Sequence, residues 1–127
     1  MKSFTFTFTE FEPHYFLAWT ISSQCYNTGK VTIKSGGNVL VEAHKNSRDC
    51  NFTMLNQAHA DINSNIVQVE VEIKEAVNEL KNSKTGGAIL DNAGRKVGYV
   101  YSVCIEDGTD DDYNDIYINL VGWSKKG

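Results

Sequence analysis

Ten consecutive residues of this 127-residue chain, 106 to 115, hold an unusual density of metal-binding oxygen atoms. The stretch reads Glu-Asp-Gly-Thr-Asp-Asp-Asp-Tyr-Asn-Asp and contains six carboxylates and one carboxamide. Two unit charges about 4 Å apart repel by roughly 1 kcal/mol in bulk water and by about 4 kcal/mol at the effective dielectric near a protein surface. Folding six such charges between two apolar segments requires a counter-charge, so the sequence predicts a site for a hard cation.

The types of ligand in this stretch favour calcium over other cations. Calcium binds about six to eight oxygens from carboxylates, amides, carbonyls and water, whereas magnesium dehydrates reluctantly and seldom takes so many protein carboxylates. The three histidines are scattered through the chain and no cysteine lies inside the stretch, so a zinc site is not predicted. The oxygen ligands that we assign to calcium belong to Glu106, Asp110, Asp112, Asn114 and Asp115.

One calcium ion would leave most of the negative charge of this stretch uncompensated, because a single Ca²⁺ offsets two of the six charges. Asp110, Asp112 and Asp115 are close enough in sequence to bridge two ions. Two adjacent calcium ions would balance most of the charge. We therefore predict two Ca²⁺ ions at this site.

The acidity of the chain is local. The formal net charge at pH 7 is −4, from 12 basic and 16 acidic residues, and six of the acidic residues lie in the stretch 106–115. The remainder shows no basic stripe, so we expect no nucleic-acid partner. The N-terminal residues contain no uninterrupted apolar segment, which predicts cytoplasmic synthesis without a signal peptide and leaves release or cell-surface display by an unconventional route open. No apolar run approaches the roughly 20 residues of a membrane helix, so we expect no membrane insertion.

The three cysteines are odd in number and form no C-x-x-C pair. We interpret Cys25, Cys50 and Cys104 as buried or partly buried free thiols that serve packing. A disulfide between Cys25 and Cys50 stays open as an alternative.

Hydrophobic periodicity predicts a fold rich in β-strands. Val67, Val69, Val71 and Ile73 alternate with polar residues, which is the period-two pattern of a half-buried strand. Glycine- and asparagine-rich turn signals separate this segment from others like it. The predicted strands are 3–9, 14–22, 31–34, 38–43, 52–55, 67–74, 88–90, 97–106 and 116–122. The aromatic residues interpreted as core or interface residues are Trp19, Tyr99, Tyr101, Tyr117 and Trp123.

Only the segment 75–84 has apolar residues at roughly helical spacing, namely Ala76, Val77 and Leu80. We expect a short helical excursion there. The length of the chain predicts a single domain over residues 1–127. Eight or nine short strands without alternating helices predict an all-β, antiparallel Greek-key β-sandwich. The acidic stretch then connects two apolar strands at one end of the sandwich.

The acidic stretch and its surroundings resemble a known family. The pattern Glu-Asp-Gly-Thr-Asp-x-Asp-Tyr-Asn-Asp at 106–115, followed by an apolar strand, a Trp and a C-terminal Gly, is similar to bacterial calcium-dependent fucose- and mannose-binding lectins that hold two calcium ions. The segments 67–71 and 17–23 are also similar to parts of these lectins, so the resemblance extends over most of the chain. It implies a compact antiparallel sandwich that associates into homodimers and often homotetramers.

The resemblance also implies how a sugar is bound. Hydroxyl groups of a fucose- or mannose-like glycan would coordinate both calcium ions directly, and the C-terminal Gly127 of one subunit would complete the site of its neighbour. The implied metal ligands are Glu106, Asp110, Asp112, Asn114, Asp115 and Gly127. The implied sugar-binding residues are Ser22, Ser23, Asp107 and Thr109.

Three features depart from the family pattern, and one of them is Asp111, where the family usually has an uncharged residue. The family has an Asn calcium ligand immediately before the residue that matches Ser22, and this chain has Ile21 there. The nearest amide side chains that could substitute for it are Gln24 and Asn27. The tail of the chain is slightly longer than in the pattern, and two lysines precede Gly127.

Two other functions would use the same acidic stretch. A calcium ion could stabilise a β-sandwich interaction module that binds no sugar, and this alternative stays open. A glycosidase would use Glu106 and Asp115 as its paired carboxylates, about 5 to 9 Å apart, with the pKa of one of them raised. Carboxylates packed around calcium have lowered pKa values instead. The sequence contains no catalytic triad or phosphate-binding loop either, so we do not expect an enzyme.

Overall fold

Nine β-strands form in the part of the chain that the structure describes. The structure is a computed structural model, and it describes residues 1–108 and 115–124. The all-β fold predicted from the sequence is confirmed. The strands are β1 (Lys2–Phe8), β2 (Phe16–Ser23), β3 (Gly29–Ser35), β4 (Asn38–Lys45), β5 (Thr53–Asp61), β6 (Val67–Ile73), β7 (Lys81–Leu90), β8 (Lys96–Glu106) and β9 (Ile116–Trp123).

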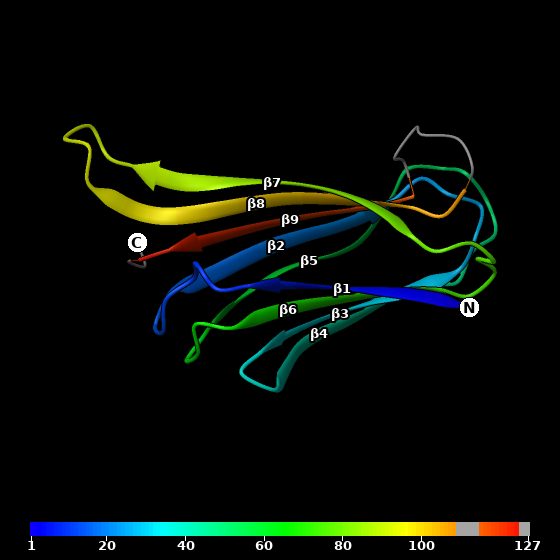
Figure 1. Ribbon diagram of the computed structural model, residues 1–127, viewed down its shortest axis with the longest axis horizontal. Coiled ribbons are helices and arrows are strands. Elements are labelled where there is room, and N and C mark those ends of the chain that lie inside the picture. Colours follow the sequence, from blue (N-terminus) through cyan, green and yellow to red (C-terminus); the bar gives the residue numbers. More distant parts are fainter. Residues whose placement is uncertain (109–114, 125–127) are drawn as a thin grey trace.

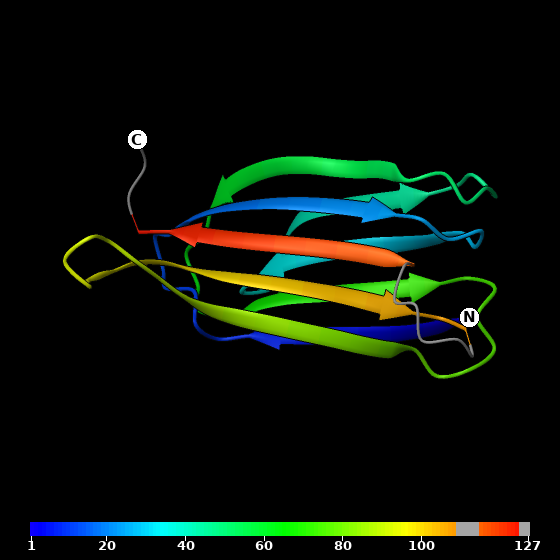
Figure 2. The same cartoon turned by 90° about the horizontal axis from the view of Figure 1, so that it is seen from above.

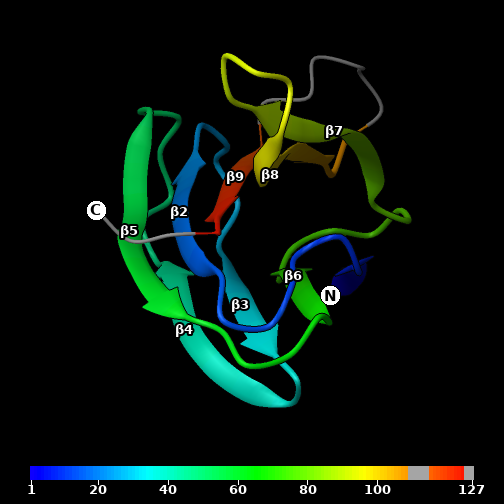
Figure 3. The ribbon, with the colours of Figure 1, turned by 90° about the vertical axis from the view of Figure 1, so that its left-hand side faces the viewer.

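The strands pack as two antiparallel sheets. One sheet has four strands in the order β1-β6-β3-β4, and the other has five in the order β5-β2-β9-β8-β7. Figure 1 shows the two layers from the side, and Figure 3 shows them from one end, curved around the space between them. Strands that are neighbours in a sheet are often distant in sequence, because the chain passes repeatedly from one sheet to the other. This arrangement is the predicted antiparallel sandwich.

The space between the sheets is filled by the alternating apolar residues of the central strands. In β6 and β9 every second residue is almost completely buried, and the residues between them are more exposed. Fully burying a Val, Leu or Ile side chain contributes about 1.5–3 kcal/mol, so these alternating rows fix the register of both sheets. The inward residues of the two strands are Val67, Val69, Val71, Ile73, Ile116, Ile118 and Leu120.

The helix predicted over 75–84 does not form. Residues 75–80 are turns and irregular backbone, and β7 begins at Lys81 and pairs with β8. Ala76 and Leu80 are buried, but Val77 is 80% exposed, so the helical spacing of the three residues is not used to cover the core. The polar residues that follow form their backbone hydrogen bonds with β8. β7 is an edge strand, which explains why it contains few apolar side chains.

The sequence located only the last residues of β7, at 88–90. The earlier part of this strand is exposed at nearly every position and contains the pair Gly86-Gly87. Gly86 is required there because a Cβ atom at this position would lie 2.4 Å from the Tyr101 ring. A glycine pair that marks a turn in the sequence pattern therefore lies inside a strand.

All three cysteines are free thiols. Cys25 and Cys104 are buried, as expected, whereas Cys50 is exposed. Among the described residues no helix is long and apolar enough to cross a membrane.

Gly122 in β9 tests the packing that holds the central strand of the larger sheet. A Cβ atom at Gly122 would lie 2.5 Å from Cδ1 of Phe11 and 3.0 Å from Cδ2 of Tyr15. Gly122→Ala should therefore lower the free energy of unfolding in urea by about 1–3 kcal/mol. Gly87→Ala is the matched control, because a Cβ atom there meets nothing within 4 Å. An equal decrease in the free energy of unfolding in the two variants would contradict this packing.

Candidate functional site

Two buried carboxylates lie at the end of the β8–β9 ladder. The last paired residues of these strands are Ile105 and Ile116. Glu106 follows Ile105 and Asp115 precedes Ile116, so the two residues lie opposite each other just beyond the last pair of the ladder. Glu106 is 1% exposed and Asp115 is 4% exposed. Two ionised carboxylates in this arrangement would repel each other, and a hydrogen bond between the Glu106 and Asp115 side chains instead favours a protonated Asp115 when no cation is bound.

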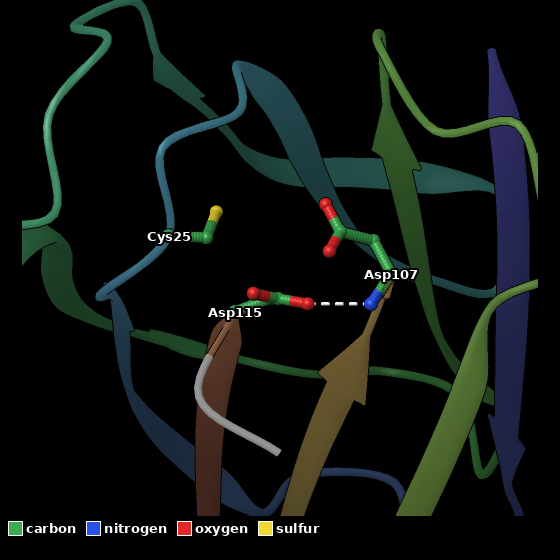
Figure 4. Close-up of side chains that lie close together, drawn as sticks. All are labelled: Cys25, Asp107 and Asp115. Carbon is green, nitrogen blue, oxygen red and sulfur yellow. Dashed lines mark hydrogen bonds between the residues drawn. The ribbon is translucent and has the colours of Figure 1, made fainter. Parts of the chain in front are cut away.

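Asp107 adds a third acidic side chain beside this pair. Its backbone N–H donates a hydrogen bond to Oδ2 of Asp115, which Figure 4 shows as a dashed line. Nδ2 of Asn27 donates to Oδ2 of Asp107. The backbone N–H of Gly108 donates to Oε1 of Glu106 at 2.7 Å. These local hydrogen bonds fix the directions in which the three carboxyl groups point.

Cys25 approaches the carboxyl groups from the turn between β2 and β3. Its Sγ atom and one carboxylate oxygen each from Asp107 and Asp115 all lie within 4.8 Å of one another. The backbone N–H of Gln24 donates to the carbonyl oxygen of Asp115 at 3.3 Å, and Oγ of Ser23 lies 3.4 Å from Sγ of Cys25. No sequence motif marks this thiol, because Cys25 reaches the site only through the pairing of β2 with β9.

Burial changes the acidity of the cluster. Burial and hydrogen bonds with the side chains of Asp107 and Glu106 raise the pKa of Asp115 far above its usual range. Burial also raises the pKa of the Cys25 thiol, and the charges of Asp115 and Asp107 act in the same direction. A divalent cation among these groups would favour the ionised carboxylates and reverse the shift of Asp115.

A polar network holds the turn 24–28 in place. The backbone N–H and the hydroxyl of Thr28 donate to Oε1 of Glu75 at 2.7 and 2.8 Å, and Nη1 of Arg48 donates to the same atom at 3.1 Å. The guanidinium carbon of Arg48 lies 4.9 Å from the ring centroid of Tyr26. The backbone hydrogen bond from Thr28 lowers the pKa of Glu75. This network joins three connections of the sandwich around the turn that positions Cys25.

The described donors fit a hard divalent cation better than a soft one. The carboxyl groups of Asp107 and Asp115 converge on the site, Glu106 forms a hydrogen bond with Asp115, and oxygen is the ligand that calcium takes in proteins. Cys25 provides a single sulfur atom, a ligand typical of zinc and softer metals. The predominance of oxygen supports the calcium prediction, and the sulfur is an addition that the sequence analysis did not foresee.

The structure brings together three of the acidic residues predicted for the site, Glu106, Asp107 and Asp115. Ser22 and Ser23 lie at the same end of the sandwich, where β2 ends. They are 5% and 0% exposed, so they offer little surface to a ligand. The predicted site residues outside the described part of the chain are Thr109, Asp110, Asp112, Asn114 and Gly127.

Most of the chain matches one known protein family. The profile of the family described as "PA-IIL: Fucose-binding lectin II (PA-IIL)" matches residues 8–124, which include the strands on both sides of the acidic stretch. The chain belongs to this lectin family. The resemblance stated from the sequence is confirmed.

Solved structures of bacterial lectins share the fold. The high-affinity mannose-binding lectin of Ralstonia solanacearum is 22% identical, with a TM-score of 0.70 over 95% of this chain and 96% of that chain. The Chromobacterium violaceum lectin CV2L, solved with alpha-methyl-fucoside, is 20% identical, with a TM-score of 0.67 over 95% and 96%. The C-terminal domain of the BC2L-C lectin of Burkholderia cenocepacia is 20% identical, with a TM-score of 0.73 over 98% and 99%. A search among curated proteins found no match.

The lectin differs from the family pattern at Ile21, and the structure shows the consequence. Ile21 is fully buried, opposite Ile118 of β9, and faces the core, so it cannot contribute to the acidic cluster. Asn27 reaches Asp107 from the neighbouring turn instead. One of the two amides that the sequence suggested as substitutes therefore lies at the site.

Replacing Cys25 with Ser tests the balance between oxygen and sulfur ligands. Cys25→Ser should retain calcium binding and weaken zinc binding, because a hydroxyl oxygen replaces the single soft ligand. Calorimetric titration of Ca²⁺ and Zn²⁺ measures both affinities. Cys104→Ser is the control, since Cys104 is the other buried thiol and is not part of the cluster. Loss of calcium binding in a folded Cys25→Ser variant would contradict the assignment to oxygen ligands.

The lowered pKa of Glu75 predicts a pH-dependent contribution to stability. A carboxyl group whose folded pKa lies below its unfolded value of about 4.3 stabilises the fold above that pH, and the stabilisation is lost as the pH falls through the folded pKa. Glu75→Gln should therefore lower the free energy of unfolding at pH 7, and the difference should shrink as the pH falls below about 4.

Urea unfolding of both proteins across this pH range measures the effect. Glu79→Gln is the control, because the Glu79 side chain is 85% exposed. If Glu75→Gln lowers the free energy of unfolding by the same amount at every pH, the loss of stability comes from packing rather than from charge.

Proposed function

We propose that the protein binds carbohydrate in a calcium-dependent manner at the acidic end of its sandwich. The observation that carries this proposal is the pair of buried carboxylates, Glu106 and Asp115, which face each other with Asp107 beside them. Burial makes it costly to hold neighbouring carboxylates ionised, and a divalent cation bound by their oxygens offsets this cost. Membership of a fucose-binding lectin family supports the view that this partner serves sugar binding.

The calcium ligands would come from both the described and the remaining part of the acidic stretch. Glu106 and Asp115 would act together with Asp110, Asp112 and Asn114. The stretch holds six negative charges, so two Ca²⁺ ions balance it better than one. When bound, the ions would supply positive centres at which sugar hydroxyls replace water, an exchange of one oxygen ligand for another.

Hydrogen-bonding side chains next to the ions would orient the sugar. Asn27 fixes the carboxylate of Asp107, which can then accept a hydrogen bond from a sugar hydroxyl in a set direction. Thr109 would add a second contact. Ser22 and Ser23 are buried, so they would act by supporting the turn 24–28 rather than as open contacts. A fucose- or mannose-like sugar is favoured by the description of the family and by those of the neighbouring structures.

Gly127 would contribute to a second copy of the chain. β9 runs away from the acidic end and finishes at the opposite end of the sandwich (Figure 1). Its eight residues span about 26 Å. The three residues after Ser124 can reach at most about 11 Å. A metal ligand from Gly127 would therefore belong to the site of another subunit, which supports a homodimer or homotetramer.

A glycan array with and without chelator tests the proposed function. The protein should bind fucose- or mannose-terminated glycans in Ca²⁺ and lose that binding in EDTA, because the sugar is held through the ions. The same array signal in calcium and in EDTA would contradict the proposal.

Thermal unfolding separates this proposal from a calcium-stabilised module that binds no sugar. A ligand that binds only the folded state raises its stability. The melting temperature should rise with Ca²⁺ and should rise again when methyl α-L-fucoside or methyl α-D-mannoside is added. A rise with calcium alone, and none with either sugar, would support the module instead.

Substitutions in the acidic stretch separate metal ligands from sugar contacts. Asp112→Ala should abolish both calcium and sugar binding, because it removes a charged metal ligand. Thr109→Ala should weaken sugar binding and leave calcium binding unchanged, because a hydroxyl that contacts only the sugar is lost. Calorimetry with Ca²⁺, and then with methyl glycoside, measures both steps. Equal loss of calcium binding in the two variants would show that the roles are assigned wrongly.

A further inference from the structure

A small polar cavity lies at the end of the sandwich opposite the acidic cluster. β5 ends beside it, whereas β8 ends at the acidic cluster, and Figure 2 shows these two strands ending at opposite ends of the molecule. Three segments meet around the cavity, namely the connection between β1 and β2, the β3–β4 hairpin and the connection between β5 and β6. The polar residues that line it are His14, Ser35, Asn38, Asp61 and Asn63.

Backbone hydrogen bonds join the three segments that form the cavity. The N–H of His14 donates to the carbonyl oxygen of Ile62 at 2.7 Å, and the N–H of Ile62 donates to the carbonyl oxygen of Tyr15 at 3.0 Å. Figure 3 looks onto this end and shows the two connections side by side. The N–H of Gly36 donates to the carbonyl oxygen of Ile66 at 3.0 Å, which joins the hairpin to the connection after β5. The walls of the cavity are therefore fixed to one another.

His14 has an unusual backbone conformation at the rim of the cavity. Its φ is 75°, and it is the one non-glycine residue with a positive φ in the described part of the chain. This conformation is unfavourable for a residue with a Cβ atom, and it persists where the surrounding structure enforces it, often at ligand sites. His14 is exposed and lines the cavity, so its imidazole is accessible to a ligand there.

Ser35 places a hydroxyl group without a hydrogen-bond partner at the floor of the cavity. It is 1% exposed, and it lies in the row of β3 that Val31 and Ile33 begin, which faces the other sheet. Its Oγ atom is the one buried side-chain nitrogen or oxygen atom without a hydrogen-bond partner among the residues that the structure describes. Buried hydroxyl groups are normally paired, because leaving one unpaired is unfavourable. A ligand in the cavity would supply the partner.

The composition of the lining favours a neutral ligand rich in hydroxyl groups. Asn38 and Asn63 each offer N–H donors and an oxygen acceptor, and the carboxylate of Asp61 offers further acceptors. The hydroxyl groups of a sugar pair with all of these, because each hydroxyl can both donate and accept. Leu40 and Ile62 supply apolar surface for the C–H groups of a sugar ring.

Other classes of ligand fit this cavity less well. Its described lining contains no Lys or Arg, so an anion would lack a permanently charged partner. In the part of the chain that was described, the groups of three or more His, Cys, Asp or Glu side chains that could hold a metal ion are limited to the cluster around Cys25. The volume of the cavity is about 260 Å³, just below the roughly 300–1,000 Å³ typical of sites for larger organic ligands. This size suits a single sugar ring.

We infer that the cavity is a second carbohydrate site, which binds one sugar ring without calcium. Asn38, Asp61 and Asn63 hold the hydroxyl groups of the ring at the rim, and Ser35 pairs with one of them at the floor. The inference does not depend on the proposed calcium site, because it uses no residue of the acidic end. The protein then presents a sugar site at each end of its sandwich.

Heteronuclear NMR of the protein in EDTA tests this inference. The probes are the methyl glycosides of α-D-mannose, α-L-fucose, β-D-galactose and N-acetyl-β-D-glucosamine, each titrated to about 50 mM. At least one of them should bind with a dissociation constant on the order of 1 mM, because a ligand of this size makes few contacts. Binding should shift the backbone N–H signals of Ser35, Asn38 and Asn63 and leave those of Cys25 and Gly108 unchanged.

The titration is repeated in Ca²⁺, where the signals of Ser35, Asn38 and Asn63 should shift in the same way. This second condition excludes an effect of calcium removal on the fold. Binding this weak does not survive the washing of a glycan array, so the second site does not alter the array result in EDTA.

Two substitutions locate the sugar in the cavity. Asn63→Ala should weaken binding in EDTA about fivefold, because it removes hydrogen bonds to the ring. Asn65→Ala is the matched control, since Asn65 lies in the same connection, is also exposed and does not line the cavity. Ser35→Ala should weaken binding by a similar factor and leave the melting temperature unchanged or higher, because the lost hydroxyl has no partner within the protein.

Several outcomes would overturn the inference. One is the absence of any shift with all four probes in both EDTA and Ca²⁺. Another is a set of shifts confined to the acidic end. Equal weakening by Asn63→Ala and Asn65→Ala would place the sugar elsewhere. A lower melting temperature of Ser35→Ala, together with an unchanged affinity for sugar, would make the role of Ser35 structural and contradict the inference.

Discussion

The facing carboxylates of Glu106 and Asp115 impose the constraint on which the acidic end of this protein depends. They lie at the end of a ladder between two apolar strands, where neither side chain can turn freely to solvent. Backbone N–H groups of the residues that follow hold their oxygens in place. Charge repulsion at such burial is offset by a proton or by a cation. The raised pKa of Asp115 favours the proton, and the proposed calcium ions would take its place in reducing the negative charge.

The sandwich assembles this end from segments that are distant in sequence. β9 lies between β2 and β8, so the end of one strand and the turn after another meet at the start of β9. The hydrogen bonds of Thr28 and Arg48 with Glu75 hold that turn.

The sequence predicted features whose signal is local. The alternating row of β6 and the density of charge in 106–115 are each visible in consecutive residues. The segment 75–84 was misjudged because three apolar residues at helical spacing also suit a turn that leads into an edge strand, where Val77 points to solvent. Cys25 was not assigned to the site because its position depends on long-range pairing of strands, which periodicity does not reveal. Asn27 is suggested as a substitute ligand by its proximity in sequence alone, and its hydrogen bond to Asp107 shows that its side chain lies at the acidic end.

Titration of Ca²⁺ into metal-free protein tests the central claim most directly. The account predicts that the wild type binds Ca²⁺ and that Asp115→Asn binds it more weakly, because the variant keeps the size of the side chain but removes one charge from the facing pair. The variant should fold, because an amide in place of the buried carboxylate removes repulsion with Glu106. Circular dichroism verifies its folding. A wild-type protein that binds no Ca²⁺, or a folded Asp115→Asn variant with unchanged affinity, would contradict the account.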